Sequence, residues 1–257
     1  MSMPGFAVLD TETTGLSPTA NRIVEIAVVT LSPDGDLTGT WSTLLDPQGP
    51  VGPTAIHHIT PDDIATAPTF PAIVGDLTDL LRGHLLVGHN VTFDLRFLAA
   101  EYRRAGWPIH FGADSAIDTM AISRRLYREH RQHTLEACCA RSQITNLMAH
   151  SALGDTLATA RLLIELVQAD GGFPHLTARQ RWEDRAHSIV WPDPPALHTP
   201  TVARAVLGAA QQAALQREIS HRLGHDGVTQ PPSQRTILTA DERRLMADRP
   251  PHFGTVG

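Results

Sequence analysis

Residues 6–15 of the 257-residue chain read Phe6-Ala7-Val8-Leu9-Asp10-Thr11-Glu12-Thr13-Thr14-Gly15. The apolar run that opens this stretch predicts a strand, and alternate side chains of a strand point to opposite faces. Apolar residues then lie on both faces, which is typical of a strand in the buried centre of a sheet. The stretch therefore predicts a central strand that carries two carboxylates, Asp10 and Glu12, on one face near its end.

Further strand and helix signals place this strand in an α/β domain. Four more strands are predicted over residues 23–31, 40–45, 85–88 and 116–118, with a hairpin turn at 34–36. Helices are predicted over residues 62–67, 72–81, 91–104, 119–128, 134–141 and 152–169. Strands that alternate with helices in this way predict a mixed sheet flanked by helices.

Composition excludes several classes of protein. The chain is 42% hydrophobic, which is enough to form a core, and its two cysteines, the neighbours Cys138 and Cys139, make neither a disulfide framework nor a zinc site. No stretch approaches the roughly 18 apolar residues of a membrane helix, and the first residues do not resemble a secretory signal. We therefore expect a cytoplasmic globular protein with no membrane partner.

The chain divides into two parts of different character. Residues 1–170 hold 11 arginines and 19 acidic residues, a net charge of −8, whereas residues 171–257 hold 10 arginines and 8 acidic residues, a net charge of +2. The second part contains proline-rich patches at 191–195 and 231–232 and an alanine- and glutamine-rich helical pattern over 202–223. We predict an α/β domain over 1–170 and a mainly helical, proline-rich C-terminal extension over 171–257.

The Asp10–Glu12 pair suggests a metal site. Two carboxylates on one face of a buried strand repel each other and resist ionisation unless a positive charge lies beside them. All-oxygen ligands favour Mg²⁺ or Mn²⁺. The alternative interpretation is a solvated turn in which the two acids cap neighbouring backbone groups.

Two further clusters lie where a helix is predicted to begin. Asn90 and Asp94 follow the apolar strand over 85–88 and are four residues apart, so they are expected on one face of a helix. The alternative is an N-capping Asn90 and a surface Asp94. His150 and Asp155 are expected on either side of a helix start, with Ser151 as the N-cap and Asp155 in the first turn, where the helix dipole favours an anion.

Taken together, these clusters resemble the DEDDh family of 3′–5′ exonucleases, and in particular its subgroup typified by the proofreading (epsilon) subunit of bacterial DNA polymerase III. The first family motif matches residues 10–15, the second matches His89, Asn90 and Asp94, and the third matches His150 and Asp155. Position 151 is serine, whereas the sister branch of the family has tyrosine there. Segments 21–26, 56–60, 68–70, 118–119 and 133–136 also look like the epsilon subgroup.

The resemblance implies a ribonuclease H-like fold with a five-stranded sheet and a two-metal mechanism. It implies that Asp10 bridges the two cations, Mg²⁺ or Mn²⁺, that Glu12 and Asp155 complete one metal site, and that Asp94 supports the other. It also implies that His150 removes a proton from the attacking water, and histidine is suited to accept a proton near neutral pH. The expected product is a nucleoside 5′-monophosphate.

The resemblance also implies a binding surface for the terminal nucleotides. Backbone amides of residues 13–15 are expected to hold the last nucleotide, with Gly15 allowing close approach. Aromatic and histidine side chains are expected to touch the last bases, although Phe93 has a core position as its alternative. The expected substrate-binding residues are Thr11, Thr13, Thr14, Gly15, His57, His58, Asn90 and Phe93.

One dense basic stretch has no place in these motifs. It consists of Arg124, Arg125, Arg128, His130, Arg131 and His133. It is either a track for nucleic-acid phosphates or a solvated helix face, and the sequence leaves both interpretations open.

The expected substrate is the single-stranded or frayed 3′ end of DNA, in replication proofreading or repair. The alternatives are an RNA-trimming enzyme like RNase T or oligoribonuclease, which a contact to the 2′-hydroxyl would decide, and a non-catalytic nucleic-acid-binding module. A polymerase or other protein partner is expected to bind through residues 171–257. The net charge of −6 is weak evidence against a nucleic-acid substrate, because bound divalent cations reverse the local field.

Overall fold

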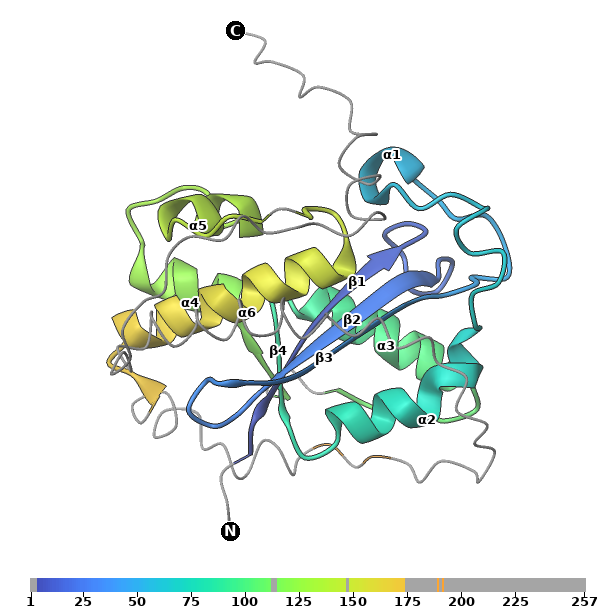
Figure 1. Cartoon of the computed structure of the whole chain (residues 1–257), viewed down its shortest axis with the longest axis horizontal. Coiled ribbons are helices and arrows are strands. Elements are labelled where there is room, and N and C mark those ends of the chain that lie inside the picture. The colour runs from blue at the N-terminus through green and yellow to red at the C-terminus, as the bar shows by residue number, and fades with distance from the viewer. Residues whose placement is uncertain (1–3, 112–114, 147, 174–188, 190, 192–257) are drawn as a thin grey trace, which may run out of the picture. The chain divides into compact units, whose positions relative to one another are not determined.

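The computed structural model describes residues 4–111, 115–146, 148–173, 189 and 191. These residues form a five-stranded mixed sheet flanked by helices, with the strand order β3-β2-β1-β4-β5 (Figure 1). The strands are β1 (Phe6–Thr13), β2 (Ile23–Leu31), β3 (Leu37–Leu44), β4 (Leu85–Gly88) and β5 (Ala116–Asp118). The first three are antiparallel, whereas β1, β4 and β5 run parallel. The predicted mixed sheet is thus confirmed.

Strand β1 is the centre of the sheet and is covered on both faces. Phe6 and Val8 lie in the core on the side of helix α6 (Ala152–Ala169), which crosses the strands in Figure 1. Ala7 and Leu9 lie in the core on the side of α2 (Phe70–Leu81) and α3 (Thr92–Arg104). All four side chains are fully buried. The predicted central strand is therefore confirmed, and the alternation assigns Asp10 and Glu12 to the face of α6.

Helix starts follow their capping residues closely. Asp118 caps α4 (Thr119–Leu126), Thr134 caps α5 (Leu135–Arg141) and Ser151 caps α6, each with its side chain accepting a backbone N–H. Five of the six predicted helices and four of the five predicted strands agree with the structure to within two residues at each end. The exception among strands is β3, which begins three residues early because Leu37 already pairs with Leu31 beyond the hairpin turn.

The region between β3 and α2 departs from the prediction. The helix predicted over 62–67 is wrong, because these residues form turns with isolated bonds such as Ala67 N–H to the Ile64 carbonyl, 3.0 Å. A helix this short is marginal unless tertiary packing supports it, and of residues 62–67 only Ile64 is buried. The short helix α1 (Thr54–His57) was not predicted, because a single turn after Pro53 leaves no periodic pattern.

A buried ion-pair cluster ties the loop after β1 to helix α3. Glu101 is 1% exposed and accepts two hydrogen bonds from Arg22, of 2.7 and 3.0 Å, and one from Arg104, 3.0 Å. Arg104 also donates to the carbonyls of Pro18 and Thr19. A carboxylate buried this deeply is stable only with its partners in place, so the cluster holds the segment that comes after Asp10 and Glu12 against α3.

The end of α6 coincides with the end of the predicted α/β domain. Gly171 and Gly172 have φ angles of 102° and 90°, a backbone conformation that glycine adopts without strain. Beyond them, Ile189 is buried in the α3-side core and Trp191 packs against it. The domain boundary at residue 170 stays a prediction, and the helix predicted over 202–223 lies outside the described residues. None of the described helices is long and apolar enough to span a membrane.

Phe97→Ala and Phe93→Ala form a matched test of the α3 packing. Phe97 is fully buried, whereas Phe93 is only partly buried. We expect Phe97→Ala to lower the free energy of unfolding by about 3–5 kcal/mol and Phe93→Ala by less than about 2 kcal/mol. Denaturant unfolding of both variants measures the difference, and equal losses would contradict the deeper burial of Phe97.

Candidate active site

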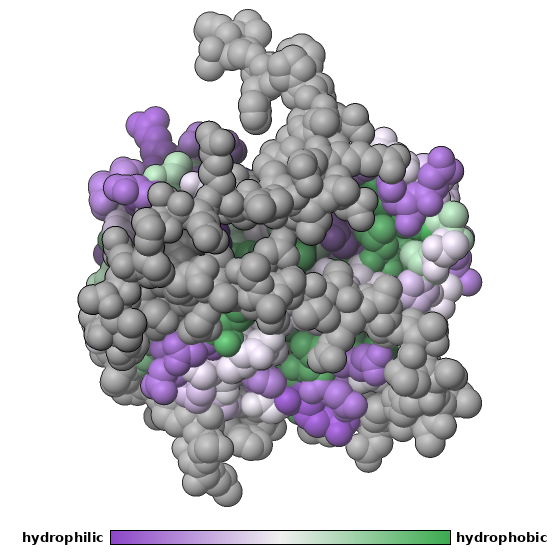
Figure 2. Space-filling view, viewed as in Figure 1, coloured by the Kyte–Doolittle hydropathy of each residue, from purple (hydrophilic) through white to green (hydrophobic). Residues whose placement is uncertain are grey.

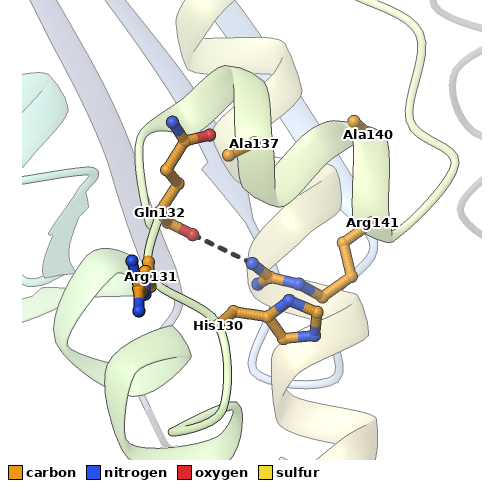
Figure 3. Close-up of a pocket in the computed structure, with 6 residues that line it drawn as sticks. All are labelled: His130, Arg131, Gln132, Ala137, Ala140 and Arg141. Atoms are coloured by element: carbon orange, nitrogen blue, oxygen red, sulfur yellow. Dashed lines mark hydrogen bonds between the residues drawn. The ribbon is translucent and has the colours of Figure 1, made fainter.

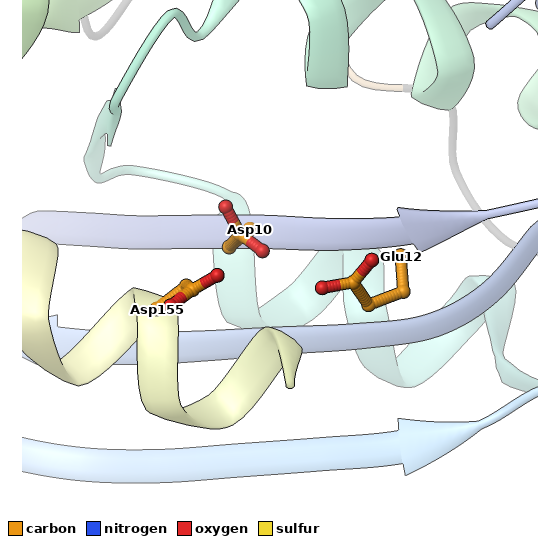
Figure 4. A group of neighbouring side chains, drawn as sticks. All are labelled: Asp10, Glu12 and Asp155. Atoms are coloured by element: carbon orange, nitrogen blue, oxygen red, sulfur yellow. The ribbon is translucent and has the colours of Figure 1, made fainter. Parts of the chain in front are cut away.

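Three carboxylates converge between β1 and the start of α6. Oxygen atoms of Asp10, Glu12 and Asp155 all lie within 4.8 Å of one another, and Figure 4 shows the three side chains facing each other across the gap between the strand and the helix. Asp10 and Glu12 share a face as predicted, and Asp155 lies in the first turn of α6 as predicted. The alternative of a solvated turn is wrong, because both acids belong to the central strand.

Asp94 approaches the same place from the opposite face of the sheet. It lies in the first turn of α3 and is 3% exposed. Its Oδ1 accepts hydrogen bonds from the backbone N–H of Thr11, 3.1 Å, and from the Thr11 hydroxyl, 2.7 Å. Asp94 is therefore no surface acid. Thr11, which was expected to bind substrate, uses both of its donors inside the protein to hold Asp94.

Burial and mutual repulsion raise the pKa values of these acids. Burial raises the pKa of Asp10 well above its usual value, and the charges of Asp94, Asp155, Glu12 and Glu25 raise it further. Burial, then the charge of Glu25, raises the pKa of Glu12 to about 8. Burial also raises the pKa of Asp94 to about 7 and that of Asp155 above its usual value. The cluster cannot be fully ionised at neutral pH without a nearby positive charge.

This donor set fits a divalent cation. The three clustered groups are carboxylates, which are the ligands that Mg²⁺ and Mn²⁺ prefer in proteins. A cation would favour the ionised form of each acid and so offset both burial and repulsion. Asp10, Glu12 and Asp155 are the residues that would hold it directly, with Asp94 beside them.

His150 lies on the loop before α6, as predicted. It is exposed, has a φ angle of 65°, and its backbone N–H donates to Asp155 Oδ2, 3.3 Å. Asn146 donates to the other oxygen of Asp155, 2.6 Å. At Gly154 an added Cβ would overlap the Met148 carbonyl, so glycine lets this loop approach the helix. The role of Asn146 was not predicted, because a single asparagine in a loop carries no recognisable pattern.

Glu25 is a second residue that was not recognised as part of the site. It lies on β2 directly opposite Glu12, and its Oε2 accepts the backbone N–H of Ala152 at the start of α6, 2.8 Å. Burial raises its pKa to about 7 even though this hydrogen bond lowers it. The signal in the sequence was an acidic residue inside the apolar run of residues 23–31.

Asn90 does not lie on a helix face with Asp94. It precedes α3 with a φ angle of 62°, and Val91 occupies the N-cap position without a side-chain cap. Both sequence interpretations of Asn90 are therefore wrong. Its backbone N–H donates to Asp118 Oδ1, 2.9 Å, which joins the end of β4 to the end of β5. Contact between Asn90 and substrate stays a prediction.

His57 is not available to touch a base. It is 3% exposed, its Nε2 lies 3.1 Å from the Val51 carbonyl, and its Nδ1 accepts the backbone N–H of Ile59, 3.0 Å. This expectation is therefore corrected, because the ring is enclosed and both of its nitrogens are bonded. His58 beside it is exposed, and its contact with substrate stays a prediction.

The loop after Glu12 differs in part from expectation. The Thr14 backbone N–H, expected to hold a nucleotide, donates to the Arg22 carbonyl, 2.9 Å, so this donor is already occupied. An added Cβ at Gly15 would lie 2.7 Å from Asn21 Nδ2. A side chain at position 15 would overlap Asn21, so glycine leaves the space that the Asn21 side chain occupies. The Thr13 hydroxyl donates to the Gly15 carbonyl, 2.8 Å, and nucleotide contacts of Thr13 and Gly15 stay predictions.

Phe93 lies at the margin of the core. Its ring is partly buried and packs against Phe97, with ring centroids 4.9 Å apart. This packing supports the core alternative for Phe93, and contact of its remaining surface with a base stays a prediction.

The basic stretch divides between structural and exposed residues. Arg125 forms two hydrogen bonds with Asp170, of 2.8 and 2.7 Å, so it belongs to the fold. Arg124, Arg128 and Arg131 are exposed, and the surface near α5 is hydrophilic in Figure 2. A hollow of about 600 Å³ there is drawn in Figure 3 and is lined by His130, Arg131, Gln132, Ala137, Ala140 and Arg141. A phosphate track at this surface stays a prediction.

Comparison with known proteins agrees with this arrangement. The chain is 37% identical over 171 residues to a DNA polymerase III subunit epsilon-like protein of Rhodobacter capsulatus, covering 64% of this chain and 24% of that protein. It is 32% identical over 165 residues to the PolC-type DNA polymerase III of Bacillus subtilis, covering 63% of this chain and 11% of that protein. The chain thus matches only a minor part of the length of these relatives.

Solved structures share the fold. The nuclease domain of 3′hExo, a DEDDh family member, superposes with a TM-score of 0.57 at 19% identity, covering 65% of this chain and 92% of that domain. Escherichia coli exonuclease I, in complex with a dT13 oligonucleotide, superposes with a TM-score of 0.57 at 18% identity, covering 68% of this chain and 43% of that protein. The predicted ribonuclease H-like fold is confirmed. The model of the family described as Exonuclease, RNase_T, matches residues 7–163, so the chain belongs to this exonuclease family.

Proposed function

We propose that the chain is a metal-dependent 3′–5′ exonuclease that hydrolyses DNA from its 3′ end to nucleoside 5′-monophosphates. The observation that carries the proposal is the cluster of Asp10, Glu12 and Asp155 within 4.8 Å. Asp94 is close enough to raise the pKa of Asp10, and the backbone N–H of His150 donates to Asp155 Oδ2. Four acids and a histidine in this arrangement match the chemical needs of two-metal phosphodiester hydrolysis.

Each residue has a defined part in the proposed mechanism. Asp10 would contact both cations. Glu12 and Asp155 would complete the metal site on the side of the attacking water, and Asp94 would support the second metal site. When bound, the cations supply charge for the phosphate and the leaving 3′ oxygen and make the water more acidic. His150, exposed at the edge of the cluster, accepts the proton of that water.

DNA is the substrate that we propose. The relatives from Rhodobacter capsulatus and Bacillus subtilis are named as DNA polymerase III proteins, and exonuclease I was solved with a DNA oligonucleotide. RNA is the second candidate, because the 3′hExo nuclease domain was solved with rAMP. We further propose a cytoplasmic location and a polymerase or other protein partner for residues 171–257, by analogy with the polymerase subunits.

Label position on the substrate tests the direction of cleavage. With 5′-labelled single-stranded DNA and Mg²⁺, we expect a ladder of labelled products that shorten one nucleotide at a time, and with 3′-labelled DNA we expect immediate release of a labelled mononucleotide. The same assay on RNA of the same sequence and on duplex DNA with a mismatched 3′ end ranks the substrates by rate of cleavage. Asp155→Ala should abolish activity while the circular dichroism spectrum stays native. Full activity of this variant would refute the metal mechanism. Early release of the 5′ label as mononucleotides or short oligomers, with the 3′ label kept on long fragments, would refute the 3′–5′ direction.

His150→Ala tests the proposed general base. We expect kcat to fall by a factor of about 10²–10⁴ with little change in the melting temperature, since the side chain is exposed. His110→Ala is the matched control, because His110 is also exposed in a loop and should leave kcat unchanged. A loss of less than threefold in His150→Ala would remove His150 from this role.

Thermal unfolding against pH tests the metal site without any substrate. Glu12 has a folded-state pKa of about 8, and Glu25 and Asp94 have about 7, all above the unfolded values near 4. The folded state therefore binds extra protons, and this stabilisation is present below pH 4 and lost as pH rises to about 8. In EDTA we expect the melting temperature to fall between pH 6.5 and pH 8, and Mn²⁺ or Mg²⁺ should restore it.

Asp10→Asn is the control for this experiment. Because this variant has one charge fewer in the cluster, its melting temperature in EDTA should fall less as the pH rises. Added Mn²⁺ or Mg²⁺ should no longer raise its melting temperature. Burial lowers the pKa of His57, His84 and His89, which gives stability that is present above pH 6.5 and lost below it, equally in both proteins. If added cation raised the melting temperature of Asp10→Asn as much as that of the native protein, the cation would bind at a different site.

A further inference from the structure

Glu25 is an acidic residue on a face of β2 that otherwise enters the core. Val29 and Leu31, which share its alternation, are buried in the core beneath α6. Across the sheet Glu25 is paired with Glu12. Like charges directly opposite each other on neighbouring strands are destabilising, so some other interaction must offset the repulsion at this position.

That interaction is a hydrogen bond to the first residue of α6. Glu25 Oε2 accepts the backbone N–H of Ala152, 2.8 Å. The first N–H groups of a helix have no partner within the helix, and a side-chain oxygen that accepts one of them supplies the missing partner. The Ser151 hydroxyl caps Gly154, 3.1 Å. The start of α6 thus has two side-chain hydrogen bonds, one from its own N-cap, Ser151, and one from Glu25, which is 127 residues away from Ala152 in the sequence.

This bond lies next to a residue of the carboxylate cluster. Asp155 lies one turn beyond the N-cap and faces Asp10 and Glu12 (Figure 4). Its backbone N–H is bonded to the Ser151 carbonyl, 3.0 Å, so Asp155 moves with the first turn of α6. A shift of this turn away from β2 would carry Asp155 away from the two carboxylates of β1 and would also move His150, which is bonded to Asp155.

We propose that Glu25 is a positioning residue, whose bond to the Ala152 N–H sets the distance between the first turn of α6 and the carboxylates of β1. The inference rests on the proposed nuclease function and adds a residue to it. In this proposal Glu25 acts through Asp155, and it is not one of the three acids that cluster within 4.8 Å. What the site requires at this position is a hydrogen-bond acceptor, and the negative charge is dispensable.

Two substitutions of similar size separate the acceptor from the charge. Glu25→Gln keeps an oxygen at the same reach and removes the charge, whereas Glu25→Met keeps the volume and removes the acceptor. We expect Glu25→Gln to stay within about fivefold of the native kcat. Glu25→Met should lose on the order of 10–100-fold, as is usual when a residue that supports a metal ligand is removed. KM for DNA should stay within twofold in both variants, because the substrate surface is untouched.

Hydrogen exchange and cation binding give readouts that do not depend on nuclease activity. The backbone amides of residues 152–155 should exchange faster in Glu25→Met and at the native rate in Glu25→Gln. Mn²⁺ affinity, measured by calorimetry, should fall in Glu25→Met and should be kept or nearly kept in Glu25→Gln. If the native protein proves inactive on every nucleic acid tested, the proposed function fails, whereas the exchange and affinity measurements still test the role of Glu25.

Val28→Ala is the control for a general loss of stability. Val28 lies on the same strand but faces the opposite core, against α2 and α3, so this variant loses packing without touching α6. We expect it to lower the melting temperature and to keep kcat within twofold. Should Glu25→Met fail to fold, Glu25→Ala replaces it with the same expected results.

Either of two results would overturn the proposal. Equal losses in Glu25→Gln and Glu25→Met would show that the charge is what matters. Native exchange rates at residues 152–155 in Glu25→Met would show that the bond does not hold the helix.

Discussion

Repulsion among carboxylates that are buried or partly buried is the constraint on which this structure depends. Asp10 and Glu12 lie on the central strand, Asp94 and Asp155 reach them from the first turns of two helices, and Glu25 lies across the sheet. Each raises the energy of ionising its neighbours. Backbone N–H groups offset part of this cost, at Thr11 for Asp94 and at Ala152 for Glu25. The remainder is what a divalent cation would neutralise.

The fold makes such a concentration of charge tolerable. Strand β1 is packed on both faces, so its backbone is rigid where the acids begin. Helices α3 and α6 approach it from opposite sides, and each points its first turn at the strand. The positive end of each helix dipole favours the acid placed there. The Glu101 cluster with Arg22 and Arg104 then holds the following loop in place.

Local patterns in the sequence predicted much of this site, because several of its parts are local. The alternation in residues 6–12 was sufficient to place Asp10 and Glu12 on one face. The serine before residues 152–169 was sufficient to place Asp155 in a first turn. The DEDDh resemblance added Asp94 and His150. Patterns failed for His57, because its ring is buried and bonded to the Val51 carbonyl and the Ile59 N–H, an arrangement that exists only in the folded loop.

The sequence by itself determined the central strand, the order of most elements and the family, since apolar periodicity, capping residues and spaced acids are all properties of neighbouring residues. Only the tertiary structure decided how the acids are held. The bond from Glu25 to Ala152 spans 127 residues, and the bond from Thr11 to Asp94 spans 83. No local pattern encodes such pairs, because each partner has an ordinary alternative within its own segment. Their pairing arises from sheet register and helix packing, which are settled only when the whole domain folds.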